Sequence, residues 1–288
     1  MTTGANGTHT NTRDCGAFLL DTMTLYSRPK MVVSWSDEPR PTTPRTDAII
    51  DETWEKQTTL AARDGRLLYN GSLCRLIAYE AGEQFSMILG PVSYKEFAGT
   101  NLFNPTLRYN EGPEVLANAV GVSGNLITPD GYLILAVRSQ SVAFHPGLIH
   151  PIGGMVEPSP VPGRPPDPFQ TMLDELGEET HVAEESVRAI NCLGMARDKK
   201  IVQPELLFDI EIDVDVPSMH HNIAIARDRS EHVDLVPVRD TPATVVDFIR
   251  NQHDRVAPIT LAGLMLHGVH KWGTGWFTAA RGYLHKVV

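Results

Sequence analysis

The chain has 288 residues, of which 42% are hydrophobic and 21% charged, a composition typical of a soluble globular protein with one large domain or two modest ones. Its formal net charge of −10 argues against a general binder of nucleic acids or membrane surfaces, because such proteins present a basic face. A metal ion and a few local cations can still hold a small anionic substrate against this overall charge.

The N-terminus and the cysteines indicate the compartment. No apolar run approaches the roughly 18 residues that span a bilayer, and the first residues lack the basic start of a signal peptide. Cys15, Cys74 and Cys192 are far apart and have no metal-ligand spacing, so we expect buried or idle thiols in a reducing compartment. We therefore expect a cytoplasmic protein that binds neither nucleic acid nor membrane.

The first part of the chain predicts a polar tail and then a small domain. Residues 1–27 are expected to form the tail, and residues 28–110 a small α/β domain. Several prolines favour an extended segment up to residue 46, and apolar spacing then predicts a helix from Asp47 to Arg63. Strand-like runs follow at 67–69, 72–79 and 84–90, the last two as a hairpin, with a short helix over 94–101.

The rest of the chain, residues 111–288, is expected to form a second domain. It contains β-rich runs, helices and the turn sequence Thr128-Pro129-Asp130. In chain order the predicted elements are strands at 117–127 and 131–138, a loop at 145–157, a proline-rich stretch at 158–166, an acidic helix, strands around 189–195 and 205–212, and helices over 242–252 and 259–272. Trp272 and Trp276 are expected to pack the C-terminal helix or a homodimer contact.

The acidic helix concentrates charge at a disfavoured position. Its predicted start consists of an N-cap, a proline at the first position and a capping-box partner: Asp167, Pro168 and Gln170. Glu175, Glu178 and Glu179 share one face near the negative end of the helix dipole, where each is disfavoured by roughly 0.3–1 kcal/mol. Clustered carboxylates repel one another unless a cation lies between them. Mg²⁺, or Mn²⁺ in its place, takes such oxygen ligands beside substrate phosphates, so the pattern predicts metal-assisted phosphate chemistry.

This pattern resembles the Nudix box of nucleoside-diphosphate hydrolases, G-x5-E-x7-R-E-U-x-E-E-x-G-U, where U is bulky and apolar. The matching positions are the opening glycine, the E-U pair, the E-E pair and the final apolar residue: Gly154, Glu175-Leu176, Glu178-Glu179 and Val182.

The departures from the box are specific. Asp174 replaces the arginine and His181 the late glycine, and the loop is six residues longer than the box prescribes. Counting back from Glu175 puts Pro166 where the middle glutamate belongs. In the family this glutamate pairs with the arginine, and losing both partners together costs far less than stranding one charge. The double absence therefore indicates a branch of the family.

The wider chain resembles the Nudix-type UDP-glucose and UDP-galactose diphosphatases, which also carry a small N-terminal domain and a box without the arginine. The likeness spans roughly residues 40–215 and includes 89–101, the proline-rich loop and Met195-Ala196-Arg197. It implies an α+β fold, a Nudix α/β/α sandwich with a mixed β-sheet, plus the small N-terminal α/β domain. It also implies Mg²⁺-dependent attack of water on a nucleotide sugar, giving UMP and a sugar 1-phosphate.

The resemblance assigns roles to individual residues. Glu175, Glu178 and Glu179 are the expected metal ligands, with the Gly153 carbonyl as a further oxygen. Glu178 and Glu179 are also expected to be catalytic, together with a carboxylate from a later strand or loop that acts as base or ligand. For that carboxylate the candidates, in order of preference, are Glu205, Asp209 and Glu211. The expected substrate-binding residues are Arg197 at the diphosphate, and Tyr94, Thr100 and Asn101 at the nucleotide or sugar.

Two alternatives stay open. The same chemistry can act on another nucleoside, as in GDP-mannose, ADP-ribose or a dinucleoside polyphosphate. An alternative from another class is a non-catalytic nucleotide-binding module. Asp174 and the lengthened loop favour such a module, whereas the retention of all three glutamates opposes it.

Overall fold

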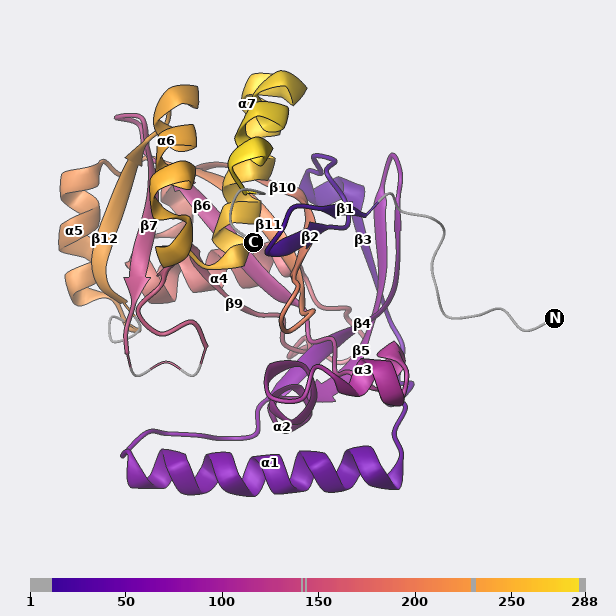
Figure 1. The fold of residues 1–288 in the computed structure, drawn as a ribbon. Helices are drawn as coiled ribbons and strands as arrows, with labels where there is room; N and C mark the ends of the chain where they lie inside the picture. The colour runs from indigo at the N-terminus through magenta and orange to yellow at the C-terminus, as the bar shows by residue number, and fades with distance from the viewer. Residues whose placement is uncertain (1–11, 141, 143, 229–231, 285–288) are drawn as a thin grey trace.

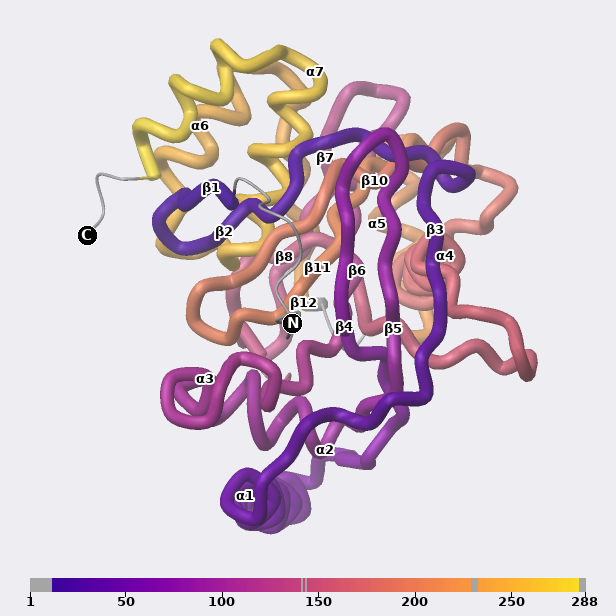
Figure 2. Tube along the Cα trace, turned by 90° about the vertical axis from the view of Figure 1, so that its right-hand side faces the viewer, coloured from indigo at the N-terminus to yellow at the C-terminus, as the bar shows by residue number. Residues whose placement is uncertain are grey.

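The computed structural model describes residues 12–140, 142, 144–228 and 232–284. Its strands form a nine-stranded mixed sheet and a separate three-stranded sheet (Figure 1). The predicted α+β class with mixed sheets is therefore confirmed. In Figures 1 and 2, helix α1 (Pro44–Arg63) lies at one end of the molecule, whereas α6 (Pro242–Gln252) and α7 (Pro258–Leu284) lie at the other.

The large sheet has the order β1-β2-β10-β11-β6-β7-β12, with β9 added to β6 and β8 to β7. Its strands are β1 Arg13–Asp14, β2 Phe18–Leu20, β6 Gly121–Ile127, β7 Tyr132–Arg138, β8 Ile149–His150, β9 Ile152–Met155, β10 Val187–Asp198, β11 Pro204–Ile212 and β12 His232–Arg239. Strands β6 and β11 pair in parallel, whereas β9 runs antiparallel to β6. Strand β6 therefore lies between the glycine-rich strand β9 and the strand that carries Glu205.

The two faces of the large sheet are covered by different helices. Because successive strand side chains point to opposite faces, Val122 and Leu126 pack with Phe169 of α4 (Pro168–Thr180), whereas Leu207 of the adjacent strand packs with Leu264 of α7. This gives the α/β/α sandwich that the family resemblance implies.

The N-terminal segment differs from the predicted tail. Residues 1–11 lie outside the described residues, but β1 and β2 pair with each other, and β2 adds to β10 at the edge of the large sheet. Cys15, Phe18 and Leu20 are fully buried there, because the edge of β10 and the end of α7 offer them apolar surface. Residues 13–20 thus belong to the large sheet. The division into domains at residues 110 and 111 stays a prediction.

The small sheet has the order β3-β5-β4. Its strands are β3 Met31–Trp35, β4 Ser72–Ala81 and β5 Phe85–Ser93. The predicted hairpin is present as β4 and β5, whereas no strand forms over 67–69. Strand β3 occupies the proline-rich leading segment and pairs in parallel with β5, a long-range contact that local sequence does not reveal.

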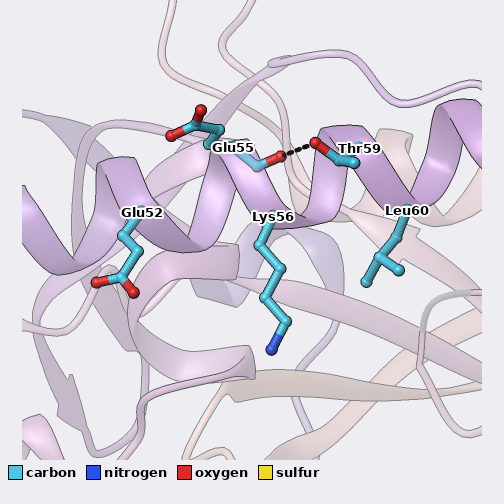
Figure 3. Close-up of a pocket in the computed structure, with 5 residues that line it drawn as sticks. All are labelled: Glu52, Glu55, Lys56, Thr59 and Leu60. Atoms are coloured by element: carbon cyan, nitrogen blue, oxygen red, sulfur yellow. Dashed lines mark hydrogen bonds between the residues drawn. The ribbon is translucent and has the colours of Figure 1, made fainter.

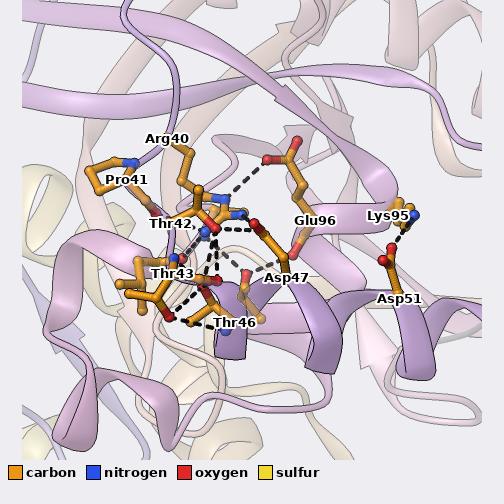
Figure 4. Close-up of polar contacts among 12 residues, drawn as sticks. Arg40, Pro41, Thr42, Thr43, Thr46, Asp47, Asp51, Lys95 and Glu96 are labelled. Atoms are coloured by element: carbon orange, nitrogen blue, oxygen red, sulfur yellow. Dashed lines mark hydrogen bonds and ion pairs between the residues drawn. The ribbon is translucent and has the colours of Figure 1, made fainter.

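A buried arginine binds helices α1 and α2 (Tyr94–Phe97) and the segment before β6; Figure 4 shows its contacts with the two helices. Arg40 is 7% exposed; its Nε donates to Glu96 Oε1 at 3.0 Å, and its Nη1 donates to the Val115 carbonyl at 2.8 Å. Thr43 next to it caps α1 through a capping box with Thr46. The start of α1, helix α2 and the segment before β6 are therefore held together.

The sequence predicts some of the remaining helices and strands but not others. Helix α6 has the predicted bounds, and α7 continues past the predicted end through a kink at Gly273, where φ is 86°. Helix α5 was not predicted because it buries only Met219 and so shows no apolar stripe, and β12 was also missed. The short helical segments are α3 Leu107–Asn110, α5 Val216–Ile225 and a π-helical turn over Ala98–Leu102 that continues α2.

Helix α4 begins as predicted, with one correction. The Asp167 side chain accepts hydrogen bonds from the backbone N–H groups of Phe169 and Gln170, and Pro168 occupies the first turn. Gln170 does not complete a capping box, because its side chain accepts from Arg28 at 3.0 Å and donates to Asp174 at 3.1 Å. Arg28 also binds Asp167 at 2.6 Å and thereby ties the N-terminal segment to the start of the helix.

Among the described residues, no helix is both long enough and apolar enough to cross a membrane. The three cysteines are free and buried, as predicted. Burial raises the pKa of Cys15 to about 11 and the pKa values of Cys74 and Cys192 to about 12, so that these thiols stay protonated at neutral pH.

A buried imidazole joins α7 to the large sheet. His267 is 1% exposed; its Nδ1 lies 2.7 Å from Asp209 Oδ2, and its Nε2 lies 3.1 Å from Asp240 Oδ1. Lys271 binds the second oxygen of Asp240. Burial by itself lowers the pKa of His267, but the charges and hydrogen bonds of the two carboxylates outweigh it and raise the pKa to about 9. His267 is therefore a charged link between α7, β11 and the end of β12.

We predict that this link makes stability depend on pH. The folded pKa of His267, about 9, exceeds the ordinary value of roughly 6.5. Its stabilisation is therefore complete below about pH 6.5 and is lost as pH rises through 9. The difference in free energy of unfolding between wild type and His267→Gln should fall across this window, by at most about 1.4 kcal/mol per pH unit, in urea titrations. The exposed His220→Gln variant is the matched control, and a pH-independent difference for His267→Gln would contradict the prediction.

Candidate functional site

The acidic helix contacts the glycine pair of β9. A Cβ on Gly154 would lie 1.8 Å from Oε1 of Glu175, so this carboxylate rests on the glycine backbone. The backbone N–H of Gly153 donates to Oε2 of Glu179, with an N–O distance of 3.3 Å. Two carboxylates one helical turn apart therefore lie on two consecutive glycines.

Gly153 and Gly154 have no space for a side chain, because neighbouring atoms lie too close to their backbone. Gly153 lies opposite Ser123 in the β6–β9 pair, and a Cβ on Gly153 would lie 2.1 Å from the carbonyl oxygen of Val122. Real Cβ contacts are never this short, and the obstructing atom is backbone, which cannot rotate away. The glycine pair thus lets β9 pack between β6 and helix α4.

Glu179 is placed where a negative charge is costly. It is 2% exposed and lies in the last turn of α4, at the negative end of the helix dipole. A carboxylate taken out of water needs hydrogen bonds or a cation to offset its desolvation. The Gly153 N–H supplies one such hydrogen bond to Glu179, and a cation would offset the desolvation further.

Glu178 points to a different neighbour. Its Oε1 lies 2.6 Å from Nη1 of Arg227, and its backbone carbonyl accepts from the N–H of Asp228 at 3.0 Å. Burial and the adjacent Asp228 carboxyl raise the pKa of Glu178, against the lowering effect of Arg227. Sequence reasoning missed Arg227 and Asp228, because they follow α5 without a motif. The alternating charges of this loop were the sequence feature that could have marked Arg227 and Asp228 as site residues.

The residues around the glycine pair offer some, but not all, of the ligands that a hard divalent ion needs. In the described ranges, no three His, Cys, Asp or Glu side chains converge closely enough to hold a metal. Glu175, Glu179 and the Gly153 backbone nevertheless offer the oxygen donors that Mg²⁺ prefers, on adjacent elements. Glu178 would have to leave Arg227 to join them.

Glu205 approaches the same glycine pair from the other side of β6. It is half-buried near the start of β11, and its Oε1 accepts a short hydrogen bond from the Ser123 hydroxyl. Ser123 in turn faces Gly153, where a Cβ would lie 2.8 Å from the serine Oγ. Burial raises the pKa of Glu205 to about 7; the Asp198 charge adds to the effect, and Ser123 and Arg138 oppose it. Glu205 is thus connected to the Glu179 contact through two residues.

The other two candidate carboxylates on β11 have different positions. Asp209 accepts from Asn125 at 2.9 Å and binds His267, so it belongs to the buried link described above. Glu211 is exposed. Of the three residues proposed from the sequence, Glu205 alone contacts a residue that packs on the glycine pair.

Arg197, expected at the diphosphate, lies in a structural ion pair. Its Nε donates to Oδ2 of Asp21 at 2.6 Å, and the Asp21 side chain is 5% exposed. This pair joins β10 to the N-terminal segment, which the sequence analysis had placed in a tail. The partner of Arg197 was therefore not foreseeable from spacing.

Tyr94, Thr100 and Asn101 contact other parts of the protein. The Thr100 hydroxyl donates to the Glu96 carbonyl and accepts from the N–H of Ala117, and Asn101 donates to the Ile201 carbonyl at 2.9 Å. Thr100 and Asn101 are fully buried. Tyr94 packs on two aromatic rings, Trp54 and Phe97. Thr100 and Asn101 thus bind the segment before β6 and the β10–β11 loop, whereas Tyr94 packs against α1 and α2.

A surface hollow lies elsewhere, along α1 (Figure 3). It is lined by side chains of both charges and one leucine: Glu52, Glu55, Lys56, Thr59 and Leu60. In Figures 1 and 2, α1 lies well apart from α4. The hollow is therefore separate from the carboxylates of the candidate site.

Comparisons of sequence find relatives that cover part of the chain. No family model matches. The chain is 30% identical over 139 residues to the human uridine diphosphate glucose pyrophosphatase NUDT22, which covers 41% of this chain and 46% of the human protein. The bovine protein of the same name is 31% identical over 136 residues, covering 40% and 47%, and the mouse protein is 35% identical over 91 residues, covering 29% and 30%. The chain thus spans at most about half the length of the curated relatives it matches.

Solved structures give a partial likeness. A C. elegans Ap4A hydrolase binary complex is 15% identical, with a TM-score of 0.33, over 54% of this chain and 98% of that one. A MutT protein from Methanosarcina mazei Go1 is 12% identical, with a TM-score of 0.29, over 58% and 93%. Both TM-scores are low, so the assignment of a family depends on the sequence relatives and on the box residues.

The box pattern that begins at Gly154 and continues at Glu175 brings its glycine and its first and last glutamates together in space. The sequence relatives carry the name of the same hydrolase type. The chain is thus similar, in these residues and in part of its sequence, to the Nudix hydrolases.

Proposed function

We propose that this protein is a Mg²⁺-dependent diphosphatase of nucleotide sugars, which cleaves UDP-glucose or UDP-galactose to UMP and the sugar 1-phosphate. The observation that carries the proposal is the placement of Glu175 and Glu179 on the backbone of Gly154 and Gly153. The named activity of the partial relatives supports the choice of substrate. The choice of a uridine nucleotide depends on them alone.

We assign different roles in this reaction to the residues around the glycine pair. Glu175, Glu179 and the Gly153 carbonyl would hold the metal, with Glu178 joining when it leaves Arg227. Bound Mg²⁺, or Mn²⁺, neutralises diphosphate charge and lowers the pKa of a coordinated water. Glu205 and Asp228 are further carboxylates that would accept a proton from the attacking water. Arg227 is a cation within reach of the substrate's phosphates.

The first prediction concerns the substrate. Purified protein with Mg²⁺ should hydrolyse UDP-glucose and UDP-galactose at least about tenfold faster, in kcat/KM, than GDP-mannose, ADP-ribose or a dinucleoside polyphosphate. The assay is phosphate release after a phosphatase is added to the products, with EDTA as the metal-free control. Preference for another nucleoside would replace the substrate but keep the chemistry. No turnover of any compound would reject the enzyme and favour a nucleotide-binding module.

The second prediction tests the carboxylates individually. Glu179→Gln and Glu175→Gln should each lower kcat by about 100-fold or more, because each removes a charged ligand with little change in shape. Glu178→Gln should have a smaller effect if its pairing with Arg227 persists in the active protein. Glu184→Gln, at an exposed position just after α4, is the matched control. Full activity in both Glu178→Gln and Glu179→Gln would refute this site assignment.

The third prediction tests the close approach. Gly154→Ala places a methyl group 1.8 Å from the Glu175 carboxylate, so this side chain must move and activity should fall by at least about tenfold. Gly177 lies in α4 itself, and a Cβ there meets nothing closer than 3.8 Å, so Gly177→Ala should keep activity and stabilise α4 by up to about 1 kcal/mol. Equal activity in the two variants would show that the fit between Glu175 and Gly154 is unimportant.

A further inference from the structure

We infer that Ser123 is a positioning residue whose hydroxyl fixes the Glu205 carboxylate at the edge of the site. The inference rests on the proposed function, because it assigns Glu205 to the hydrolytic reaction. Ser123 is 2% exposed, and its hydroxyl donates to Oε1 of Glu205. A serine hydroxyl has one proton to donate, and here the carboxylate receives it.

Strand register puts Ser123 next to Gly153 on one side and near Glu205 on the other. Strand β6 pairs in parallel with β11, with Glu205 opposite Gly121, and antiparallel with β9, with Ser123 opposite Gly153. Because residues two apart share a face, Gly121 and Ser123 both point to the side of the sheet on which Glu205 lies. The serine is thus the β6 side chain within reach of both Glu205 and the glycine pair.

Gly121 also lies against the Glu205 side chain. A Cβ at this position would lie 3.1 and 3.2 Å from Cγ and Cδ of Glu205, and 2.9 Å from the amide nitrogen of Gln203. The glutamate side chain therefore lies along the strand backbone, with its stem on Gly121 and its head on Ser123. Few rotamers are open to Glu205, because its methylene groups are held by packing and its carboxylate by one hydrogen bond.

Two charged residues also act on the Glu205 carboxylate. Asp198 repels the Glu205 carboxylate, and Arg138 attracts it. Asp198 is itself held by His145, with 3.2 Å between Nε2 and Oδ2. The Ser123 hydrogen bond is directional and so favours one orientation of the carboxylate. Loss of such a supporting contact typically costs 10–100-fold in activity.

The test is a double-mutant cycle on UDP-glucose hydrolysis with Ser123→Ala, Glu205→Gln and the double variant. Ser123→Ala should lower kcat on the order of 10–100-fold with KM changed less than about threefold, and it should have no further effect when Glu205 is already Gln. Ser34→Ala is the matched control, since its hydroxyl also bonds within a strand pair but lies in the small sheet. Melting temperatures verify that each variant is folded.

An infrared measurement gives a second readout without turnover. The carboxyl band that disappears in Glu205→Gln should shift in Ser123→Ala, because the hydroxyl bond to that group is lost. Independent, multiplying losses in the two single variants, an unshifted band, or full activity in Glu205→Gln would each overturn the inference while leaving the proposed function intact. Absence of turnover in the wild type would instead reject the proposed function.

Discussion

Close packing of helix α4 on the backbone of β9 is the constraint on which the candidate site depends. Glu175 lies on Gly154, and Glu179 binds the N–H of Gly153. A Cβ on Gly154 would clash with the Glu175 carboxylate, and a Cβ on Gly153 would clash with the Val122 carbonyl. Two carboxylates, one of them buried, are thereby placed on the glycine backbone, where a hard cation would offset their charge.

The same packing separates the three glutamates. Residues three and four apart share a helix face, yet the glycine pair receives Glu175 and Glu179, while Glu178 lies at the margin and pairs with Arg227. Such an exposed pair contributes little to stability, so it can open at small cost. The arginine thus neutralises part of the acidic end of α4.

The N-terminal segments support this arrangement from outside. Arg28 binds both Asp167 and Gln170 at the start of α4, in a chain whose box lacks the usual glutamate and arginine. Cys74 of β4 hydrogen-bonds with Val156 and Val120, which joins the small sheet to the end of β9 and the start of β6. Thr100 and Asn101, expected in a substrate pocket, make similar connections. Residues that resemble a family motif therefore serve here to fix the position of the strands that carry the site.

Local patterns in the sequence determined the helices α1, α4 and α6, the β4–β5 hairpin, and the acidic chemistry of α4. These features depend on periodicity, caps and turn residues, which act within a few positions of the chain. Tertiary structure alone decided that β2 extends β10, that Arg197 meets Asp21, and that Arg227 meets Glu178. It also decided which of the three candidate carboxylates lies beside Ser123, namely Glu205, through the parallel register of β6 and β11. Pairings between distant segments depend on strand order and register, and no spacing along the chain encodes them.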